Sequence, residues 1–194
     1  MIEITLQDLK DLCPTTRRLT LARMVEPINE TLPEFELTTT LRIAAFLAQT
    51  AHESMGFSRF SEIASGKAYD NNIGLGNTEP AAIRIAHQHG STPGQFWKGH
   101  GPIQITGYYN HLHCGQALGL DLVNEPTLLE EPTNGFRGAG WFWRVKKLNY
   151  YADIPDFPTI TRRINGGTNG ARERTALYNK MLDILEAQWP DTPL

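Results

Sequence analysis

Two glutamates nine residues apart, Glu53 and Glu62, have the clearest potential for chemistry in this sequence. Glu53 ends an apolar run, where the partial negative charge of a helix C-terminus and the apolar neighbours both disfavour an ionised carboxylate. We therefore expect Glu53 to hold its proton at a higher pH than a free glutamate does, as a general acid must. A surface glutamate that merely ends a helix is the alternative.

Glu62 follows the turn-like residues 54–56 and becomes a second carboxylate of the same site if the chain doubles back beside the helix end. Inverting glycosidases hold two carboxyl groups about 6.5–9.5 Å apart, with room for an attacking water. A loop of nine residues can place the two carboxyl groups at that distance, but so can loops of many other lengths.

The segment Gly99–Thr106 is predicted to be a short β-like run with Gln104 and Thr106 on the same side. Small polar side chains in this arrangement suit the binding of a water or a sugar hydroxyl, and an edge strand with a polar face is the alternative. Aromatic side chains could stack on sugar rings, although most aromatic residues are core, Trp141 first among these. The candidates are Tyr69, Tyr108, Tyr109, Trp97 and Trp141.

A buried helix over Leu41–His52 must position Glu53, because its residues are apolar nearly all round. The threonines at 38–40 offer it an N-cap. Before it, Leu6–Val25 has helical spacing interrupted by Pro14, which predicts two short helices.

The remainder predicts a mainly α fold with a cleft built from loops. Glycines punctuate the polar stretch Ser65–Thr106, and a long irregular segment of this kind is often functional. Glu130–Lys147 is predicted to be helical. Asn169 can cap a last helix, whose apolar positions recur at helical spacing. These positions are Leu177, Met181, Leu185 and Trp189.

Composition excludes several classes of protein. The 194 residues carry 18 basic and 21 acidic side chains, a net charge of −3, which gives no electrostatic reason to expect a nucleic-acid partner. There is no repeat or linker, so we predict one catalytic domain over residues 1–194 without a separate wall-binding domain. No signal peptide or membrane-spanning run is visible, and we expect synthesis in the cytoplasm without membrane insertion.

Neither metal nor cofactor is expected. The cysteines, Cys13 and Cys114, could pair, but two buried or idle thiols are the favoured interpretation. The histidines at 87, 89, 111 and 113 are spaced two apart in polar surroundings without a third ligand.

Five segments, in order, resemble glycoside hydrolase family 19, and together they cover most of the chain. They are Gln49–Ser54, Glu62 with Ala64–Tyr69, Leu75–Thr78, Lys98–Gly107 and Ile164–Gly167. Arg174, four residues before Tyr178, resembles the arginine of the family near its last helix.

The resemblance implies a lysozyme-like α+β fold, mainly helical, with the cleft between two lobes. It also implies single-displacement hydrolysis with inversion, in which Glu53 is the acid, Glu62 the base and Thr106 helps to position the water. Arg174 would support the carboxylates, and we expect it to lie beside Glu62 and so separate the pair into acid and base. The residues expected to bind substrate are His52, Tyr69, Gln104, Tyr109, Asn110, Asn165 and Arg174.

The chain departs from the family pattern at two places, each of which loses an arginine. Tyr69 is followed by Asp70-Asn71-Asn72, and Gly99-His100-Gly101 precedes the Pro-Ile-Gln segment. The charge of the cleft and its preference among sugar subsites can therefore differ from those of the family. Since a free histidine titrates at about pH 6.5, His100 could make activity depend on pH near 6.

The short spacing from Glu53 to Glu62 and the Ser-Gly-Lys-Ala-Tyr string resemble the bacteriophage endolysin branch of the family. The leading hypothesis is a monomeric lysin that hydrolyses β-1,4 bonds of peptidoglycan during host cell lysis, reaching the wall after membrane breach. The alternatives are a chitinase, an effector of bacterial antagonism, and a non-catalytic glycan-binding protein. Which of the two alternating bonds is cut stays open.

Overall fold

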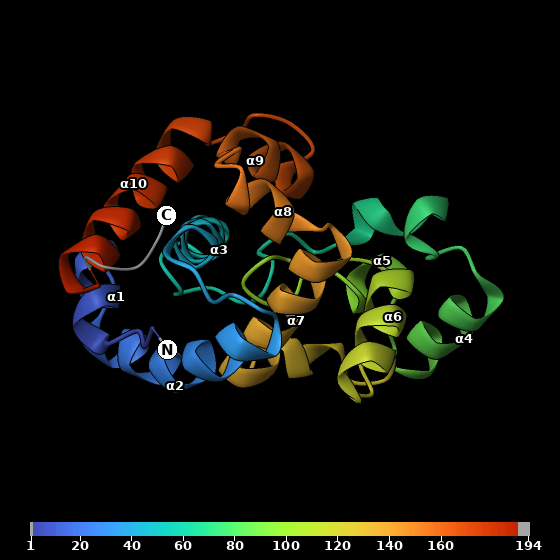
Figure 1. The fold of residues 1–194 in the computed structure, drawn as a ribbon. Helices are drawn as coiled ribbons and strands as arrows, with labels where there is room; N and C mark the ends of the chain where they lie inside the picture. Colours follow the sequence, from blue (N-terminus) through green and yellow to red (C-terminus); the bar gives the residue numbers. More distant parts are fainter. Residues whose placement is uncertain (1, 190–194) are drawn as a thin grey trace.

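Helix α3 (Thr40–Glu53) lies at the centre of the larger lobe, as its sequence, apolar nearly all round, predicts. Thr39 caps it by accepting a hydrogen bond from the Arg42 N–H (3.2 Å). The chain is described here by a computed structural model over residues 2–189. Around α3 lie the other helices of this lobe: α1 (Leu6–Leu12), α2 (Arg18–Glu34), α7 (Pro132–Val145), α8 (Leu148–Asp153), α9 (Phe157–Asn165) and α10 (Ala171–Gln188). Figure 1 shows α3 almost end-on, with α10 on one side and α2 and α7 below it.

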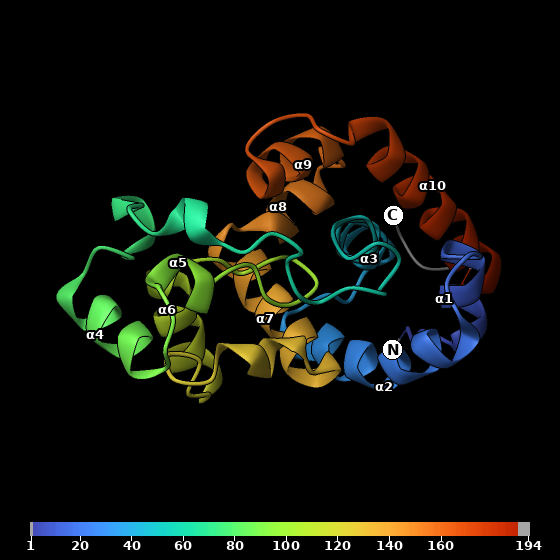
Figure 2. The ribbon, with the colours of Figure 1, turned by 180° about the vertical axis from the view of Figure 1, so that it is seen from behind.

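A smaller lobe has its own apolar core of Ala82, Ala86, Trp97 and Tyr108. It is built from η1 (Lys67–Tyr69), η2 (Ile73–Leu75), α4 (Pro80–Gln88), α5 (Pro93–Phe96) and α6 (Tyr108–Leu118), and η3 (Pro126–Glu130) leads back to α7. Both ribbon views show this lobe projecting to one side of the α3 bundle (Figures 1 and 2). The prediction of a mainly α, two-lobed fold is confirmed.

The structure corrects several boundaries. The second N-terminal helix is longer than predicted: α2 continues through Pro27 and Pro33 to Glu34. The stretch Ser65–Thr106 is not irregular throughout, since it contains α4 and α5, each with a proline in its first turn, where the missing N–H costs nothing. The last helix is preceded by Gly170 in a left-handed conformation, so Asn169 does not cap it.

The segment Gly99–Thr106 is also not a strand. Within residues 2–189 the only β pairings are isolated bridges from His100 to Ser61 and to Ile105. Gln104 has a positive φ of 57°, which breaks the alternation expected of it and Thr106. The segment is a tight turn held beside Glu62. None of the helices between residues 2 and 189 is both long and apolar enough to cross a bilayer.

The turn after α3 aims the chain from Glu53 toward Glu62. Met55, Gly56 and Phe57 all have positive φ values, of 53°, 67° and 63°. The Thr16 hydroxyl fixes this turn by donating to the Gly56 carbonyl (2.9 Å). Three consecutive left-handed residues are costly unless their surroundings hold them in place.

Gly56→Ala should therefore destabilise the protein, by about 1–3 kcal/mol. A Cβ at this position would lie 2.6 Å from Thr16 Oγ1, in addition to the positive φ. Urea unfolding measures the difference. Gly90→Ala is the matched control, because Gly90 has the same φ of 67° but open space around it. Equal losses in both variants would show that contact with Thr16 adds nothing.

Candidate active site

Glu53 lies at the C-terminus of α3, where its carboxylate forms an ion pair with Arg174 of α10. Arg174 Nη2 is 2.6 Å from Glu53 Oε1. The Glu53 side chain is 21% exposed, and its Oε2 accepts no hydrogen bond from residues 2–189. Our expectation that Arg174 lies beside Glu62 is therefore wrong: its guanidinium contacts the predicted acid.

Arg174 is held from three sides and is only 2% exposed. Its Nη1 donates to Gln49 Oε1 (2.6 Å) and its Nε to the Asn169 carbonyl (3.2 Å). Gln49, fully buried one turn before Glu53, also donates to the Thr161 hydroxyl (2.9 Å). A buried guanidinium with every nitrogen in contact with protein is suited to positioning Glu53, and it leaves little of Arg174 to bind sugar directly.

Asn165 and His52 border the same network. Asn165 Nδ2 donates to the Asn169 carbonyl (3.4 Å), which Arg174 also contacts. The half-buried ring of His52 packs against Gly170. Burial, followed by the nearby charge of Arg174, lowers the pKa of His52. Both residues thus lie near Glu53, while their contact with sugar stays a prediction.

Glu62 lies beside the smaller lobe and is held by two donors. Tyr69 Oη donates to Glu62 Oε1 (3.0 Å), and the Gly99 N–H donates to Oε2 (2.9 Å). Lys98 Nζ donates to the Glu62 carbonyl (3.0 Å), which fixes the backbone as well. Hydrogen bonds of this kind stabilise a carboxylate in its charged form, the form that a base needs. Tyr69, expected to bind substrate, here positions Glu62.

Tyr69→Phe should lower kcat about tenfold, because a charge-assisted hydrogen bond to the base is lost. Burial first, and then the hydrogen bond and charge of Glu62, raise the pKa of Tyr69, so its proton stays on the phenol near neutral pH and the hydroxyl remains a donor. Initial rates at saturating substrate measure the effect. Tyr151→Phe, which removes a hydroxyl bound to Arg163, is the control. An unchanged kcat in Tyr69→Phe would contradict the role.

Thr106, Gln104 and Asn110 form a chain of side-chain contacts to backbone carbonyls. The Thr106 hydroxyl donates to the Gln104 carbonyl (2.9 Å), and Gln104 Nε2 donates to the Gly101 carbonyl (3.0 Å). Asn110 Nδ2 donates to the Thr106 carbonyl (2.7 Å). All three side chains are partly exposed, so they retain atoms for a water or a sugar hydroxyl.

The aromatic candidates divide into two groups. Trp97 is fully buried and Tyr108 is 9% exposed, so both belong to the core of the smaller lobe and cannot stack on a sugar. Tyr109 is partly exposed and donates its hydroxyl to Glu79 Oε1. Its ring packs on Gly76, where any side chain would collide with it. Trp141 is partly buried against the larger core.

His100 is buried, so the expectation that it titrates near pH 6 is wrong. It is 2% exposed, and burial lowers its pKa to about 3, helped by the charges of His111 and Lys98. Its ring meets His111 edge-to-face at 5.4 Å. Within residues 2–189, neither ring nitrogen of His100 has a hydrogen-bond partner, and the same holds for His111 Nε2.

The thiols and the acidic groups give no sign of another chemistry. Both cysteines are free and buried, and burial raises the pKa of Cys13 to about 11 and of Cys114 to about 12. Residues 2–189 contain no group of three or more His, Cys, Asp or Glu side chains arranged to hold a metal.

The sequence analysis gave Gln49, Gly99 and Asn169 no role in the site, although each holds a catalytic candidate. A polar Gln49 inside an otherwise apolar helix was the available signal, since a buried amide needs partners. Gly99 and Asn169 act through their backbone, and such contacts leave no mark in side-chain chemistry. The whole arrangement places two carboxylates in different settings: one paired with a guanidinium and partly free, the other held by neutral donors.

A family model and curated relatives both match this chain to chitinases. The model of glycoside hydrolase family 19, described as Chitinase class I, matches residues 30–152, a range that includes Glu53, Glu62 and Thr106. An endochitinase of Gossypium hirsutum is 29% identical over 181 residues, 77% of this chain and 55% of that protein. An endochitinase of Arabidopsis thaliana is 36% identical over 146 residues, 74% of this chain and 46% of that protein. The chain thus spans about half the length of these relatives.

Solved structures share the fold. Chitinase C from Streptomyces griseus aligns with a TM-score of 0.69 at 22% identity, covering 94% of this chain and 76% of its own. A bacterial family 19 chitinase aligns with a TM-score of 0.68 at 20% identity and covers 94% of both chains.

Proposed function

Since the chain belongs to glycoside hydrolase family 19, we propose that it hydrolyses β-1,4 bonds between N-acetylated amino sugars with Glu53 as acid and Glu62 as base. The observation that carries this proposal is the different setting of the two carboxylates. An inverting mechanism needs one carboxyl to protonate the leaving oxygen and the other to activate water.

The local contacts suit these roles. Arg174 holds Glu53 through Oε1 and leaves Oε2 for the proton and the leaving oxygen. Tyr69 and Gly99 each donate a hydrogen bond to one carboxylate oxygen of Glu62, which holds the side chain in a fixed position, as a base requires. Thr106 and Asn110, from the turn and helix that follow Gly101, lie in the smaller lobe where an attacking water can be held. Reaction requires that the glycan lie between the lobes, with the water on the side of Glu62.

Within this chemistry we propose peptidoglycan as the substrate and cell lysis as the role, with the wall reached after membrane breach and the protein acting as a monomer. The support is the nine-residue spacing of the glutamates and the Ser-Gly-Lys-Ala-Tyr string, which resemble the bacteriophage endolysin branch. Chitin is the second candidate, favoured by the curated relatives, which are endochitinases.

One experiment separates the two substrates. Purified peptidoglycan and colloidal chitin are each incubated with the wild-type protein, and turbidity and new reducing ends are followed, with Glu62→Gln as the inactive comparison. We expect clearing of peptidoglycan with new reducing ends. Cleavage of chitin alone would assign the protein to the chitinases, and inactivity on both would favour a glycan-binding protein without catalysis.

A further inference from the structure

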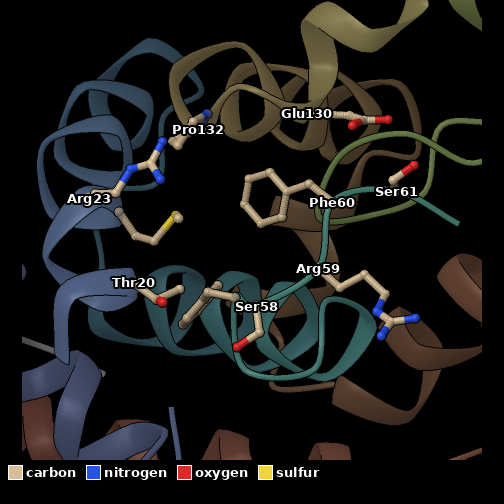
Figure 3. A pocket seen from close by; sticks show the side chains of 10 residues that line it. Thr20, Arg23, Ser58, Arg59, Phe60, Ser61, Glu130 and Pro132 are labelled. Atoms are coloured by element: carbon tan, nitrogen blue, oxygen red, sulfur yellow. The ribbon is translucent and has the colours of Figure 1, made fainter. Parts of the chain in front are cut away.

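A pocket of about 430 Å³ opens between α2 and the segment 57–61, with the start of α7 on its far side (Figure 3). None of the residues predicted to be catalytic lines it. Its lining consists of Thr20, Arg23, Met24, Phe57, Ser58, Arg59, Phe60, Ser61, Glu130 and Pro132.

The pocket is rich in donors that have no partner in the protein. Among residues 2–189, no hydrogen bond or ion pair is made by the guanidinium of Arg23 or Arg59. The hydroxyls of Thr20, Ser58 and Ser61 are equally unpartnered. By contrast, Arg42 and Arg137, on the same lobe, each contact a carboxylate. A pocket with two such cations favours an anionic, acceptor-rich ligand.

The floor of the pocket is apolar and firmly packed. Met24, Phe57 and Phe60 are 6%, 1% and 9% exposed. Phe60 meets Phe136 edge-to-face at 5.7 Å, which holds its ring in place. In Figure 3, Phe60 lies at the centre, Arg23 and Arg59 lie on opposite sides of it, and Glu130 lies across from Ser58. A ligand of this shape would carry carboxylates at separate points, a positive group near Glu130, and an apolar stem.

The pocket begins one residue from the proposed base. Ser61 lines it, and the next residue is Glu62, about 3.8 Å away from Cα to Cα. Neighbouring side chains on an extended segment point to opposite faces. The Glu62 carboxylate is turned toward Tyr69 and Gly99, so a group bound in the pocket at Ser61 does not compete for these contacts.

We propose that this pocket binds the short stem peptide of peptidoglycan, through its carboxylates on Arg23 and Arg59 and its amino group on Glu130. This inference rests on the proposed function. A stem of four residues extends at most about 13–14 Å, and the pocket begins at Ser61, the residue before Glu62. Chitin carries no such peptide and would leave the donors unpaired, so the pocket would favour one polymer over the other.

The test compares substrates with and without the peptide. Arg23→Gln/Arg59→Gln is assayed on intact peptidoglycan and on glycan strands from which an amidase has removed the stems. We expect kcat/KM to fall tenfold or more on intact peptidoglycan and to change less than twofold on the stripped strands. Arg17→Gln/Arg18→Gln is the matched control: it removes the same charge from exposed positions near the start of α2 that do not line the pocket.

Equal losses on both substrates would overturn the proposal, as would equal losses in the control variant, which would indicate bulk charge. A second measurement separates this inference from the proposed function: calorimetric titration of a free stem tetrapeptide into the wild-type chain and the Arg23/Arg59 variant. If the wild type cuts chitin but no peptidoglycan, peptidoglycan fails as the proposed substrate, and the pocket is still supported by tetrapeptide binding that the variant loses. No binding to the wild type would overturn the pocket whatever polymer is cut.

Discussion

Glu53→Gln should lower kcat/KM for the glycan by about 10²–10⁴-fold, the contribution expected of a general acid. Glutamine has the same shape and retains an oxygen for Arg174 Nη2, so the ion-pair position stays filled while the acidic proton is lost. Glu62→Gln should cause a loss of similar size, because an amide cannot take a proton from the attacking water. Thermal unfolding of both variants should stay within a few degrees of the wild type.

The two roles are separated by changing the leaving group. An aryl β-glycoside releases a phenolate that needs little protonation, so Glu53→Gln should recover most of its activity on such a substrate. Glu62→Gln should stay inactive, since water must still be activated. Equal recovery of both variants, or recovery of Glu62→Gln alone, would contradict the assignment of acid and base.

The contact between Arg174 and Glu53 changes the explanation of how Glu53 differs from Glu62. The sequence suggested that burial at a helix end would distinguish Glu53 and that a guanidinium would distinguish Glu62. In the structure the guanidinium lies on Glu53, and neutral donors from Tyr69 and Gly99 hold Glu62. Separation into acid and base therefore depends on which oxygen stays free and on how the substrate covers Glu53, more than on a single charged neighbour.

The sequence predicts the elements that follow from local pattern. The helix that carries Glu53 was predictable because its residues are apolar nearly all round and a threonine precedes it. Arg174 meets Gln49 across 125 residues of chain, and no local pattern encodes such a contact. The segment Gly99–Thr106 was mistaken for a strand because its residue types suit one, whereas the positive φ of Gln104 is imposed by packing against Gly99 and by its bond to the Gly101 carbonyl.

Burial is the property that the sequence leaves most open. Trp97 and Tyr109 look alike as sugar platforms, yet one fills the core of the smaller lobe and the other is partly exposed. His100 was expected to titrate near pH 6, as an exposed histidine does. Its neighbours, Ile105 in the turn and His111 on α6, instead enclose it. Protonation of His100 is therefore expected to affect the stability of the protein and not the pH dependence of its activity.

His100 and His111 should make the protein lose stability in mild acid. Burial lowers the pKa of His100 to about 3 and of His111 to about 4, both below the ordinary value of 6.5. Because the unfolded chain takes up these protons first, the stabilisation is fully present above pH 6.5 and is lost as pH falls toward 4. The slope should approach about 1.4 kcal/mol per pH unit for each histidine.

The surrounding charges do not relieve this penalty. Lys98 opposes protonation of His100, and Glu130, the carboxylate nearest to it, has its Oε1 3.9 Å from Nδ1 and is 35% exposed. His111 Nδ1 lies 2.8 Å from the Gly107 carbonyl, so a neutral ring donates there and leaves Nε2 as an acceptor without a partner. Protonating the ring of His100 or of His111 would place a positive charge beside the other imidazole.

His100→Phe isolates the contribution of the pair. Phenylalanine retains a ring against His111 and removes two buried nitrogens that lack partners, so stability at pH 7.5 should be unchanged or higher by about 1 kcal/mol. Between pH 6.5 and 4, urea unfolding of the variant should show a slope lower by about one proton than that of the wild type. His113→Phe, on the exposed face of α6, is the control and should retain the wild-type slope. If His100→Phe also kept that slope, the acid sensitivity would have to come from carboxylates elsewhere in the fold, and the buried pair would carry no part of it.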